Sequence, residues 1–294
     1  RPGLLLMGHA TPAQVAAPGL SCAQDGLAQR ILDLGVTELV VATDQRQDWP
    51  VRQLVYLQMA GIRTIDLAAF IERETGRVDL AWIRPMQVML TQGFTSTSLG
   101  LRMAKRAFDV SAALVLLIAL APLIAVVVLA IRVDSPGPAL FWQERVGQYG
   151  RPFWLVKLRS MSVHAEADGQ PRWAAQDDPR VTRIGRWLRQ LHIDELPQLW
   201  NVLRGDMSFV GPRPERPEFV RQLAAEIPYY DDRHHLRPGI TGWAQINYPY
   251  AASLDDARAK LEYDLFYTQN AHLVLDALIL LQTVRVLIWR SGAR

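Results

Sequence analysis

Residues 191–203 read LHIDELPQLWNVL, with two adjacent carboxylates ahead of an apolar segment. Proline is tolerated only in the first turn of a helix, so Pro197 predicts a helix start here, with Leu199 and Val202 on its buried face. Asp194 is then expected at or near the N-cap, where free N–H groups stabilise an anion and can also bind a phosphate. An ordinary capping aspartate beside a solvated glutamate is the alternative, and the surrounding sequence must decide between them.

The composition limits the class of protein. The 294 residues are 50% hydrophobic and 21% charged, which suits one large or two modest domains. A net charge of +3 is too small to indicate nucleic acid binding, but basic residues concentrate after Arg102, which suits an anionic membrane surface or phosphorylated substrates. The single Cys22 excludes an internal disulfide. Because the chain starts with Arg1 and shows no signal peptide, we expect an N-terminal portion to be missing.

Residues 1–90 alternate strand and helix patterns. Strands are predicted over 37–43 and 62–65, and helices over 49–60 and 67–75. Strands joined by helices imply a parallel sheet, so this region predicts an α/β domain. No G-x-G-x-x-G pattern follows a strand, and we expect no nucleotide site in this domain. A Gly/Ser/Thr linker is expected over 91–104.

The stretch Val110–Ile131 has no charged residue and would be about 33 Å long as a helix, which is enough to cross a bilayer. Two features favour a helix that enters the membrane and leaves on the same face. Basic residues flank both ends: Arg102, Lys105, Arg106 and Arg132. A proline also lies near the midpoint, at Ala121-Pro122, where it bends a helix. These residues alone support crossing and re-entry equally, and re-entry would keep both flanking domains in the cytosol.

The remaining sequence surrounds the carboxylate pair with turns and basic residues. Strand-like segments over 141–147 and 153–159 flank a turn, and the basic run 180–189 leads into the pair. Gly205 is expected to end the helix, and residues 211–215 (GPRPE) form an extended loop. The apolar stretch 261–289 is predicted to be a helix on the membrane surface or packed on the domain, because Asp276, Gln282 and Arg285 interrupt it.

From Lys105 to the C-terminus, roughly 190 residues, the chain resembles the monotopic phosphoglycosyl transferases, the bacterial sugar transferases that start exopolysaccharide and O-antigen repeat units. The motifs that carry the resemblance are KRAFD, the proline-broken hydrophobic run, SPGPALFWQERVG, KLRSM, DPRVTRIGRWLRQLHIDELPQLWNVLRGDMSFVGPRPE and RPGITGWAQIN. Residues 1–90 are similar to the Rossmann-like domain of long-form members, and residues 70–77 with the C-terminus are closest to an exopolysaccharide subgroup.

The resemblance implies an α/β fold in two parts. The first is a parallel Rossmann-like domain over 1–90. The second is a mixed α+β monotopic membrane domain with a re-entrant helix over 105–135, kinked at Pro122, and a catalytic domain over 136–294. It places the chain at the bacterial inner (cytoplasmic) membrane, in contact with membrane lipids and with its catalytic domain on the cytoplasmic face. The long forms make a homodimer plausible.

The implied reaction is the transfer of a sugar 1-phosphate from a UDP-sugar to a polyprenyl phosphate such as undecaprenyl phosphate, with release of UMP. In the family the aspartate of an Asp-Glu pair attacks the β-phosphate and forms a covalent phosphosugar intermediate, and Mg²⁺ is required. Asp194 and Glu195 occupy those positions, so both are the expected catalytic residues and metal ligands. The family's arginine before the pair falls on Arg189, and that of the GPRP loop on Arg213.

The chemistry of the residues agrees with this implication. An aspartyl phosphate is reactive enough to pass its phosphoryl group to a second acceptor. Mg²⁺ prefers oxygen ligands and commonly joins a carboxylate to substrate phosphates. Arginine and lysine bind phosphate, and we expect Arg145, Lys157 and Arg159 to do so beside Arg189 and Arg213. Adjacent side chains on a helix point in different directions, so Asp194 and Glu195 are expected to have different roles. Glu195 is expected to bind the metal, or to transfer a proton and position the reacting groups.

Two other readings compete with this one. A glycosyl transferase that moves only the sugar commonly has an Asp-x-Asp motif, and the sequence has none. A non-catalytic, membrane-anchored scaffold or regulator of polysaccharide assembly should have lost the carboxylates or the arginines, and the chain has both. The residues do not identify the sugar; family habit puts UDP-glucose and UDP-galactose first.

Overall fold

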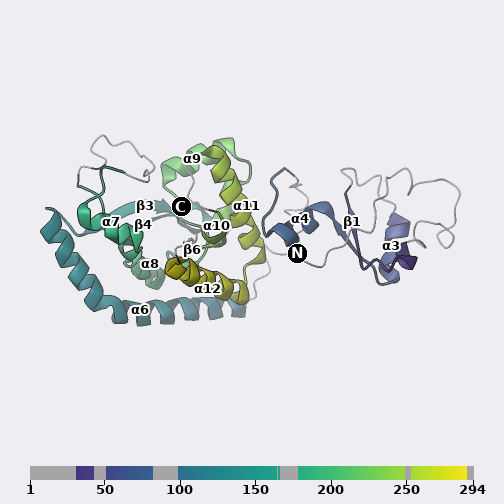
Figure 1. Ribbon diagram of the computed structural model, residues 1–294, viewed down its shortest axis with the longest axis horizontal. Coiled ribbons are helices and arrows are strands. Elements are labelled where there is room, and N and C mark those ends of the chain that lie inside the picture. Colours follow the sequence, from purple (N-terminus) through teal and green to yellow (C-terminus); the bar gives the residue numbers. More distant parts are fainter. Residues whose placement is uncertain are drawn as a thin grey trace. The chain divides into compact units, whose positions relative to one another are not determined.

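The computed structural model describes residues 31–42, 51–81, 99–163, 165, 178–248 and 253–289. The chain divides into two compact units, residues 1–83 and 84–294. Helices and strands of both units are labelled in Figure 1.

The N-terminal unit contains a parallel pair of strands joined by a helix. Its elements are β1 (Glu38–Val41), α3 (Val51–Met59), β2 (Arg63–Asp66) and α4 (Leu67–Thr75). Val40 pairs with Ile65 in parallel register, which confirms the predicted pairing of the two strands. Asp66 starts α4 by accepting a hydrogen bond from the Ala69 N–H at 2.7 Å. The Rossmann-like assignment stays a prediction, because residues 1–30, 43–50 and 82–90 lie outside the described residues.

The C-terminal unit begins with one long helix, α6 (Leu99–Asp134), of 36 residues. The helix starts earlier than expected, because residues 99–104 are helical where a linker was predicted; residues 91–98 lie outside the described part. Pro122 lies inside α6, and Figure 1 shows two arms with a bend between them. Prolines bend helices because they lack the N–H for one backbone hydrogen bond and clash with the preceding turn.

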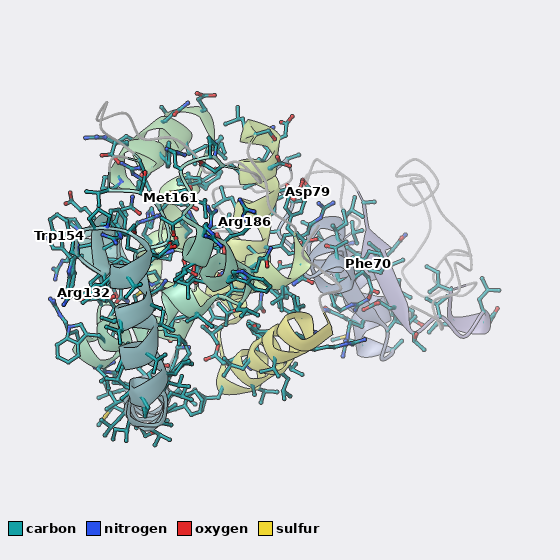
Figure 2. All side chains as sticks on the ribbon, turned by 60° about the vertical axis from the view of Figure 1, so that its left-hand side comes forward. Phe70, Asp79, Arg132, Trp154, Met161 and Arg186 are labelled. Carbon is teal, nitrogen blue, oxygen red and sulfur yellow. The ribbon has the colours of Figure 1, made fainter. Side chains whose placement is uncertain are left out.

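Most of α6 is exposed. Only Asp109, Ala113, Val127 and Ile131 are buried within it, so Ala121 and Pro122 lie on an exposed stretch. In Figure 2, where Arg132 is labelled on this helix, side chains project outward around it. Its length and composition would allow it to cross a membrane.

The domain that packs on α6 combines a hairpin with short helices. The two predicted strand segments are confirmed as β3 (Leu140–Val146) and β4 (Pro152–Leu158), which pair antiparallel as a hairpin. After it come α7 (Arg183–Gln190), the 3₁₀ turn η4 (Ile193–Glu195), α8 (Gln198–Arg204), β5 (Ser208–Val210), α9 (Pro217–Glu226), the 3₁₀ helix η5 (Tyr230–His235), β6 (Gly239–Thr241) and α10 (Trp243–Asn247). Strands β5 and β6 form a second, parallel pair. Gly205 ends α8 in the left-handed conformation, as expected.

The predicted C-terminal helix over 261–289 is wrong in its extent, because two helices cover this region. They are α11 (Leu254–Asn270) and α12 (Leu273–Trp289). Ala271 is extended between them, and the ring Nδ1 of His272 accepts a hydrogen bond from the Leu275 N–H at 3.0 Å, which starts the second helix. The two helices differ in character, because α11 carries several charged residues whereas α12 is largely apolar.

The two arms of α6 pack on the same domain. Ala113 contacts a core that includes Leu155 of β4 and Val202 of α8. Ile131 contacts a second core that includes Leu188 of α7. Figure 1 shows α7 and α8 on the inner side of the bend. Both ends of the hydrophobic helix are therefore fixed to one compact unit.

Polar contacts hold the first arm of α6 to this domain. Lys105 Nζ lies 2.5 Å from Asp276 on α12, and Tyr267 donates to the other oxygen of that carboxylate at 2.6 Å. Arg106 donates to the Val202 and Leu203 carbonyls at the end of α8, and the buried Asp109 accepts from the Phe209 N–H. We call Lys105, Arg106, Asp109, Tyr267 and Asp276 the α6 anchor. The sequence suggested only a flanking-charge role for Lys105 and Arg106.

Candidate active site

Asp194 and Glu195 lie in the 3₁₀ turn η4, between α7 and α8. His192 reverses the chain with a left-handed φ of 54°, and Glu195 and Leu196 donate backbone hydrogen bonds that close the turn. Helix α8 begins only at Gln198, after Pro197. The expectation that Asp194 caps this helix is therefore wrong, because the backbone of Asp194 belongs to a separate turn. The phosphate site expected at the helix start loses its basis with it.

Glu195 is held by two cations from distant parts of the chain. Lys157 of β4 donates to Glu195 Oε1 at 3.0 Å, and Arg213 of the GPRPE loop donates to the same oxygen at 2.7 Å. Burial opposes ionisation of Glu195, but the charges and hydrogen bonds of Arg213 and Lys157 outweigh it and hold its pKa well below the usual value. Glu195 is thus an anion whose charge is matched inside the site.

Asp194 is in the opposite situation. Its side chain is buried, with 8% of the residue exposed, and it accepts no hydrogen bond within the described ranges of the chain. Burial raises its pKa, and the nearby charge of Glu195 adds to the effect, while Lys157 opposes it. Asp194 is therefore a buried carboxylate without a counter-charge of its own, beside one that is neutralised by two cations.

The loop that carries Arg213 is fixed at three consecutive carbonyls. Arg233 donates to the Arg213 carbonyl at 3.0 Å, Arg145 donates to the Pro214 carbonyl at 2.9 Å, and the Val146 N–H donates to the Glu215 carbonyl at 2.9 Å. At the start of the loop the backbones of Gly211 and Gly239 approach so closely that a Cβ on either residue would clash with main-chain atoms. The side chain of Arg213 is thus directed by a rigid backbone.

Arg145 acts on this loop more than on the carboxylates. Besides the Pro214 carbonyl, it donates to Gln143, and it lies 3.6 Å from Glu215. Burial lowers the pKa of Arg145 to about 10, with Glu215 opposing the change. Of the predicted cations, Lys157 and Arg213 thus lie beside Asp194 and Glu195. Arg145 binds the backbone of the loop instead.

Arg159 makes its hydrogen bonds at the end of α6 and none to the carboxylate pair, and its role in phosphate binding stays a prediction. It is buried and donates to the Pro136 and Ser135 carbonyls and to the Ser135 hydroxyl, where it caps the end of α6. These acceptors adjoin the last turn of the helix, whose carbonyls have no partner inside it. Arg189, in the last turn of α7, is half-buried and makes no side-chain hydrogen bond or ion pair in the part of the chain that the structure describes.

The sequence did not point to three residues that the structure brings next to the loop. Arg233 and Asp264 form a buried ion pair of 2.6 Å, and Tyr230 accepts from the same guanidinium at 2.8 Å. The segment containing Arg233 has neighbouring aspartates and histidines typical of a surface turn, and Asp264 lies in a helix with other charged residues. Only their burial distinguishes them.

The carboxylate pair can be compared with what Mg²⁺ needs. Among the described residues no group of three or more His, Cys, Asp or Glu side chains could enclose a metal. Mg²⁺ usually takes one or two protein carboxylates and completes its six ligands with water and substrate phosphates. Asp194 is unpaired, and Glu195 shares only Oε1 with its cations, so the donor set fits that mode.

Comparison with known proteins gives consistent matches. The sequence model of the family described as "Bacterial sugar transferase" matches residues 100–290. A UDP-N-acetylgalactosamine-undecaprenyl-phosphate N-acetylgalactosaminephosphotransferase of Aeromonas hydrophila is 41% identical over 268 residues, which cover 89% of this chain and 62% of that protein. An undecaprenyl-phosphate glucose phosphotransferase of Komagataeibacter xylinus is 47% identical over 194 residues, or 64% of this chain and 36% of that protein.

A third relative is closer in length. The UDP-glucose:undecaprenyl-phosphate glucose-1-phosphate transferase of Caulobacter vibrioides is 46% identical over 192 residues, which cover 64% of this chain and 71% of that protein. The chain thus spans less than two thirds of the length of the first two relatives and somewhat more of the third.

Proposed function

Because the chain belongs to the bacterial sugar transferase family, we propose that it transfers a sugar 1-phosphate from a UDP-sugar to undecaprenyl phosphate and releases UMP. This would be the first membrane step in the synthesis of an exopolysaccharide or O-antigen. The observation that carries the proposal is the asymmetric carboxylate pair, in which Glu195 is neutralised by two cations and Asp194 remains unpaired. The relatives named above act on UDP-N-acetylgalactosamine or UDP-glucose by their names, so a donor screen should contain both sugars.

Asp194 is the proposed nucleophile. One of its oxygens forms a bond to the β-phosphorus of the donor, the bond from that phosphorus to the bridging oxygen breaks, and UMP leaves with the electron pair. An oxygen of undecaprenyl phosphate then attacks the same phosphorus, and the Asp194 carboxylate leaves unchanged. Burial supports this role, because a poorly solvated carboxylate that makes no hydrogen bond is more reactive than a solvated one.

Glu195, Lys157 and Arg213 prepare the site for anions. The carboxylate of Glu195 holds two cationic groups beside Asp194 before any substrate arrives, so their positions need no rearrangement during the reaction. These cations can bind the donor phosphates as UMP departs. Arg189, which has no protein partner in the described ranges, is available to bind a further phosphate oxygen.

Mg²⁺ is part of the proposal, with Asp194 and Glu195 as its protein ligands. When bound, it neutralises charge on the diphosphate and stabilises the leaving UMP. The chain's own residues supply the nucleophile and the fixed cations.

We propose that α6 enters the cytoplasmic membrane and returns to the same face, with the catalytic domain in the cytosol. Supporting this, residues near both ends of α6 bind the same domain. Lys105 pairs with Asp276, and Ser135, just after the helix, accepts from Arg159. A domain cannot lie on both faces of a bilayer, so a helix fixed to it at both ends fits re-entry better than crossing. Labelling of single cysteines before Lys105 and after Arg132 should report the same face, and labelling from opposite faces excludes re-entry.

The reaction is tested by incubating the protein with labelled UDP-sugars, undecaprenyl phosphate and Mg²⁺ and measuring UMP. Release of UMP with at least one donor is expected. Absence of UMP with every donor would favour a non-catalytic scaffold. Mass spectrometry of the protein incubated with donor alone should find a phosphosugar on Asp194, and an adduct on another residue would refute the assignment of the nucleophile.

A further inference from the structure

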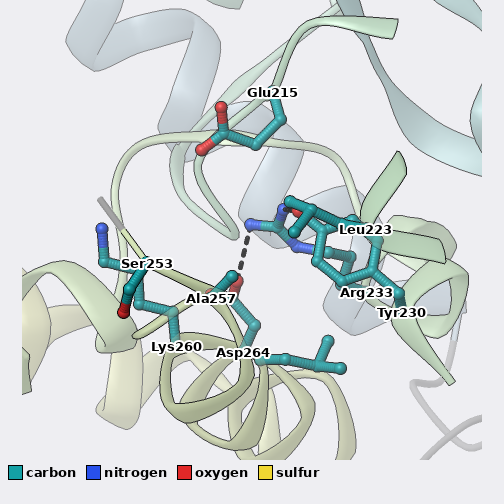
Figure 3. Close-up of a pocket in the computed structure, with 9 residues that line it drawn as sticks. Glu215, Leu223, Tyr230, Arg233, Ser253, Ala257, Lys260 and Asp264 are labelled. Atoms are coloured by element: carbon teal, nitrogen blue, oxygen red, sulfur yellow. Dashed lines mark hydrogen bonds and ion pairs between the residues drawn. The ribbon is translucent and has the colours of Figure 1, made fainter. Parts of the chain in front are cut away.

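A cavity with both charged and apolar residues in its lining lies next to the loop that carries Arg213 (Figure 3). Its volume is about 60 Å³, which is room for about four water molecules. The GPRPE loop, α9, η5 and α11 surround it. Its charged lining residues are Glu215, Arg233, Lys260 and Asp264. The cavity is thus joined to the candidate active site through one short loop, since Glu215 follows Arg213 by two residues.

Glu215 presents an unsatisfied carboxylate to this cavity. Its backbone carbonyl is fixed by the Val146 N–H, but its side chain makes no hydrogen bond within the described residues. Its cationic contact, with Arg145, is 3.6 Å long, and 29% of the side chain is exposed. Figure 3 shows the Glu215 carboxylate on the opposite side of the cavity from Asp264.

The buried Arg233–Asp264 pair lines one side of the cavity, and one N–H of Arg233 has no hydrogen-bond partner among the described atoms. Asp264 Oδ2 accepts from Arg233 Nη2 at 2.6 Å, whereas Arg233 Nε is buried and finds no partner among the described atoms. Arg233 also holds the Arg213 carbonyl at 3.0 Å. A ligand in the cavity would therefore contact the residue that fixes the Arg213 loop.

The mixture of charges selects the ligand chemistry. A phosphate would meet the carboxylates of Glu215 and Asp264, and a metal ion would meet the cations of Lys260 and Arg233. An apolar group would leave the buried Arg233 Nε and the Glu215 carboxylate without a hydrogen bond, which is costly. A hydroxyl donates one hydrogen bond and accepts two, so it can satisfy a carboxylate and a cation at once. Neighbouring hydroxyls match this lining best.

On the basis of the proposed function, we propose that this cavity binds a pair of neighbouring hydroxyls of the UDP-sugar, with Glu215 accepting and Lys260 donating. The donor carries such pairs on both sides of its diphosphate, on the ribose and on the transferred sugar. The two sources share one chemistry, and the experiment below separates them.

Donor binding is measured by isothermal titration calorimetry with Mg²⁺, in an Asp194→Asn background so that the donor is not consumed. The donors are UDP-glucose and UDP-N-acetylgalactosamine, a UDP-sugar with 2′-deoxyribose, and UDP-sugars lacking single hydroxyls on the hexose. Each is titrated into protein carrying Glu215→Gln or Lys260→Met. Glu226→Gln and Arg258→Met are matched controls at exposed positions on α9 and α11. Thermal unfolding confirms that every variant is folded.

We expect Glu215→Gln to raise the Kd of the best-binding donor about 10- to 100-fold, as for the loss of a hydrogen bond to a charged group. With Glu215 intact, the donor that lacks the contacted hydroxyl should bind with a higher Kd than the complete donor. In Glu215→Gln this difference in Kd should largely disappear, because the substitution and the missing hydroxyl delete the same contact. A ribose analogue that behaves this way assigns the cavity to the nucleoside, and a hexose analogue assigns it to the sugar.

Two results would overturn the assignment. In the first, neither Glu215→Gln nor Lys260→Met changes the difference in Kd between any deoxy donor and the complete donor. In the second, both variants bind every donor with the same Kd as the control variants. These outcomes mean that the cavity holds water only. A failure of the proposed function looks different. In that case the protein with Asp194 intact releases no UMP, while the coupling between Glu215 and a donor hydroxyl persists.

Discussion

The candidate active site and the α6 anchor are built from the same residue types and serve different ends. In the anchor, each oxygen of the Asp276 carboxylate has a partner, one in Lys105 and one in Tyr267. In the active site, Lys157 and Arg213 both bind one oxygen of Glu195, and Asp194 has neither cation as a hydrogen-bond partner. A buried carboxylate with complete partners holds elements together. One that lacks them is destabilising and remains available to form a new bond.

The contrast between the two regions predicts that Asp194 is essential for the reaction. Replacing Asp194 with Asn should lower the rate of UMP release by about four orders of magnitude or more, as expected for the loss of a nucleophile. Asp255→Asn, at an exposed position in the first turn of α11, is the control and should leave the rate within about twofold, as for a neutral surface change. More than 1% residual activity in Asp194→Asn would sink the nucleophile assignment.

Arg159 and Arg189 were both predicted to bind phosphate, but we expect their substitution to have different effects. Arg159→Met removes the cap of α6 and leaves several buried carbonyls unpaired, so the free energy of unfolding should fall by about 2–4 kcal/mol with KM for the donor unchanged. Arg189→Met should leave stability within about 0.5 kcal/mol and raise KM about tenfold. Denaturant unfolding and UMP-release kinetics measure the two effects. The reverse pattern of effects would show that Arg159 acts on the substrate more than on the end of α6.

The anchor should affect stability without affecting chemistry. Lys105→Met leaves the Asp276 carboxylate with Tyr267 as its partner, and the free energy of unfolding should fall by about 1–3 kcal/mol. This is less than for a fully buried pair, because 30% of the Lys105 side chain is exposed. Thermal unfolding in lipid nanodiscs checks the loss, and adding Asp276→Asn should recover part of it. A variant that unfolds normally but releases UMP slowly would assign Lys105 to the site.

The smallest expected effect is on stability: ionised Glu195 and ionised Asp194 should contribute to the free energy of unfolding with opposite signs. The lowered pKa of Glu195 means that its ionised form stabilises the fold above its unfolded pKa near 4.5, and this contribution is lost as pH falls through the folded pKa. The raised pKa of Asp194 means that its charge destabilises the fold at neutral pH, and the penalty disappears as pH falls through the raised pKa towards 3.8.

At pH 7, Asp194→Asn should therefore increase the free energy of unfolding by about 1 kcal/mol, and Glu195→Gln should decrease it by about 1–3 kcal/mol. The Asp194 difference should disappear as pH falls towards 4, whereas most of the Glu195 difference should persist at pH 4 and shrink only at lower pH. Chemical denaturation at several pH values measures them. Equal destabilisation by the two variants would show that Asp194 has a partner in solution.

Much of the local structure could be predicted because it depends on neighbouring residues. Strand-like segments on both sides of the Gly147–Gly150 turn indicated strands β3 and β4, and Gly205 indicated the end of α8. The contacts of the α6 anchor could not be predicted, because they join residues that lie far apart in the sequence. Lys105, for example, is 171 residues from its partner Asp276.

The sequence by itself determined the candidate nucleophile pair, the proline inside a hydrophobic run and the family, since each is a property of residue order and spacing. Only the tertiary structure decided what each charge does. Arg159, Arg145 and Arg213 are equivalent as sequence letters, yet they bind the end of α6, the back of the loop and Glu195. The same holds within the Asp194–Glu195 pair. The physical reason is that a buried charge takes its role from the partner that compensates it, and that partner arrives through folding from a remote part of the chain.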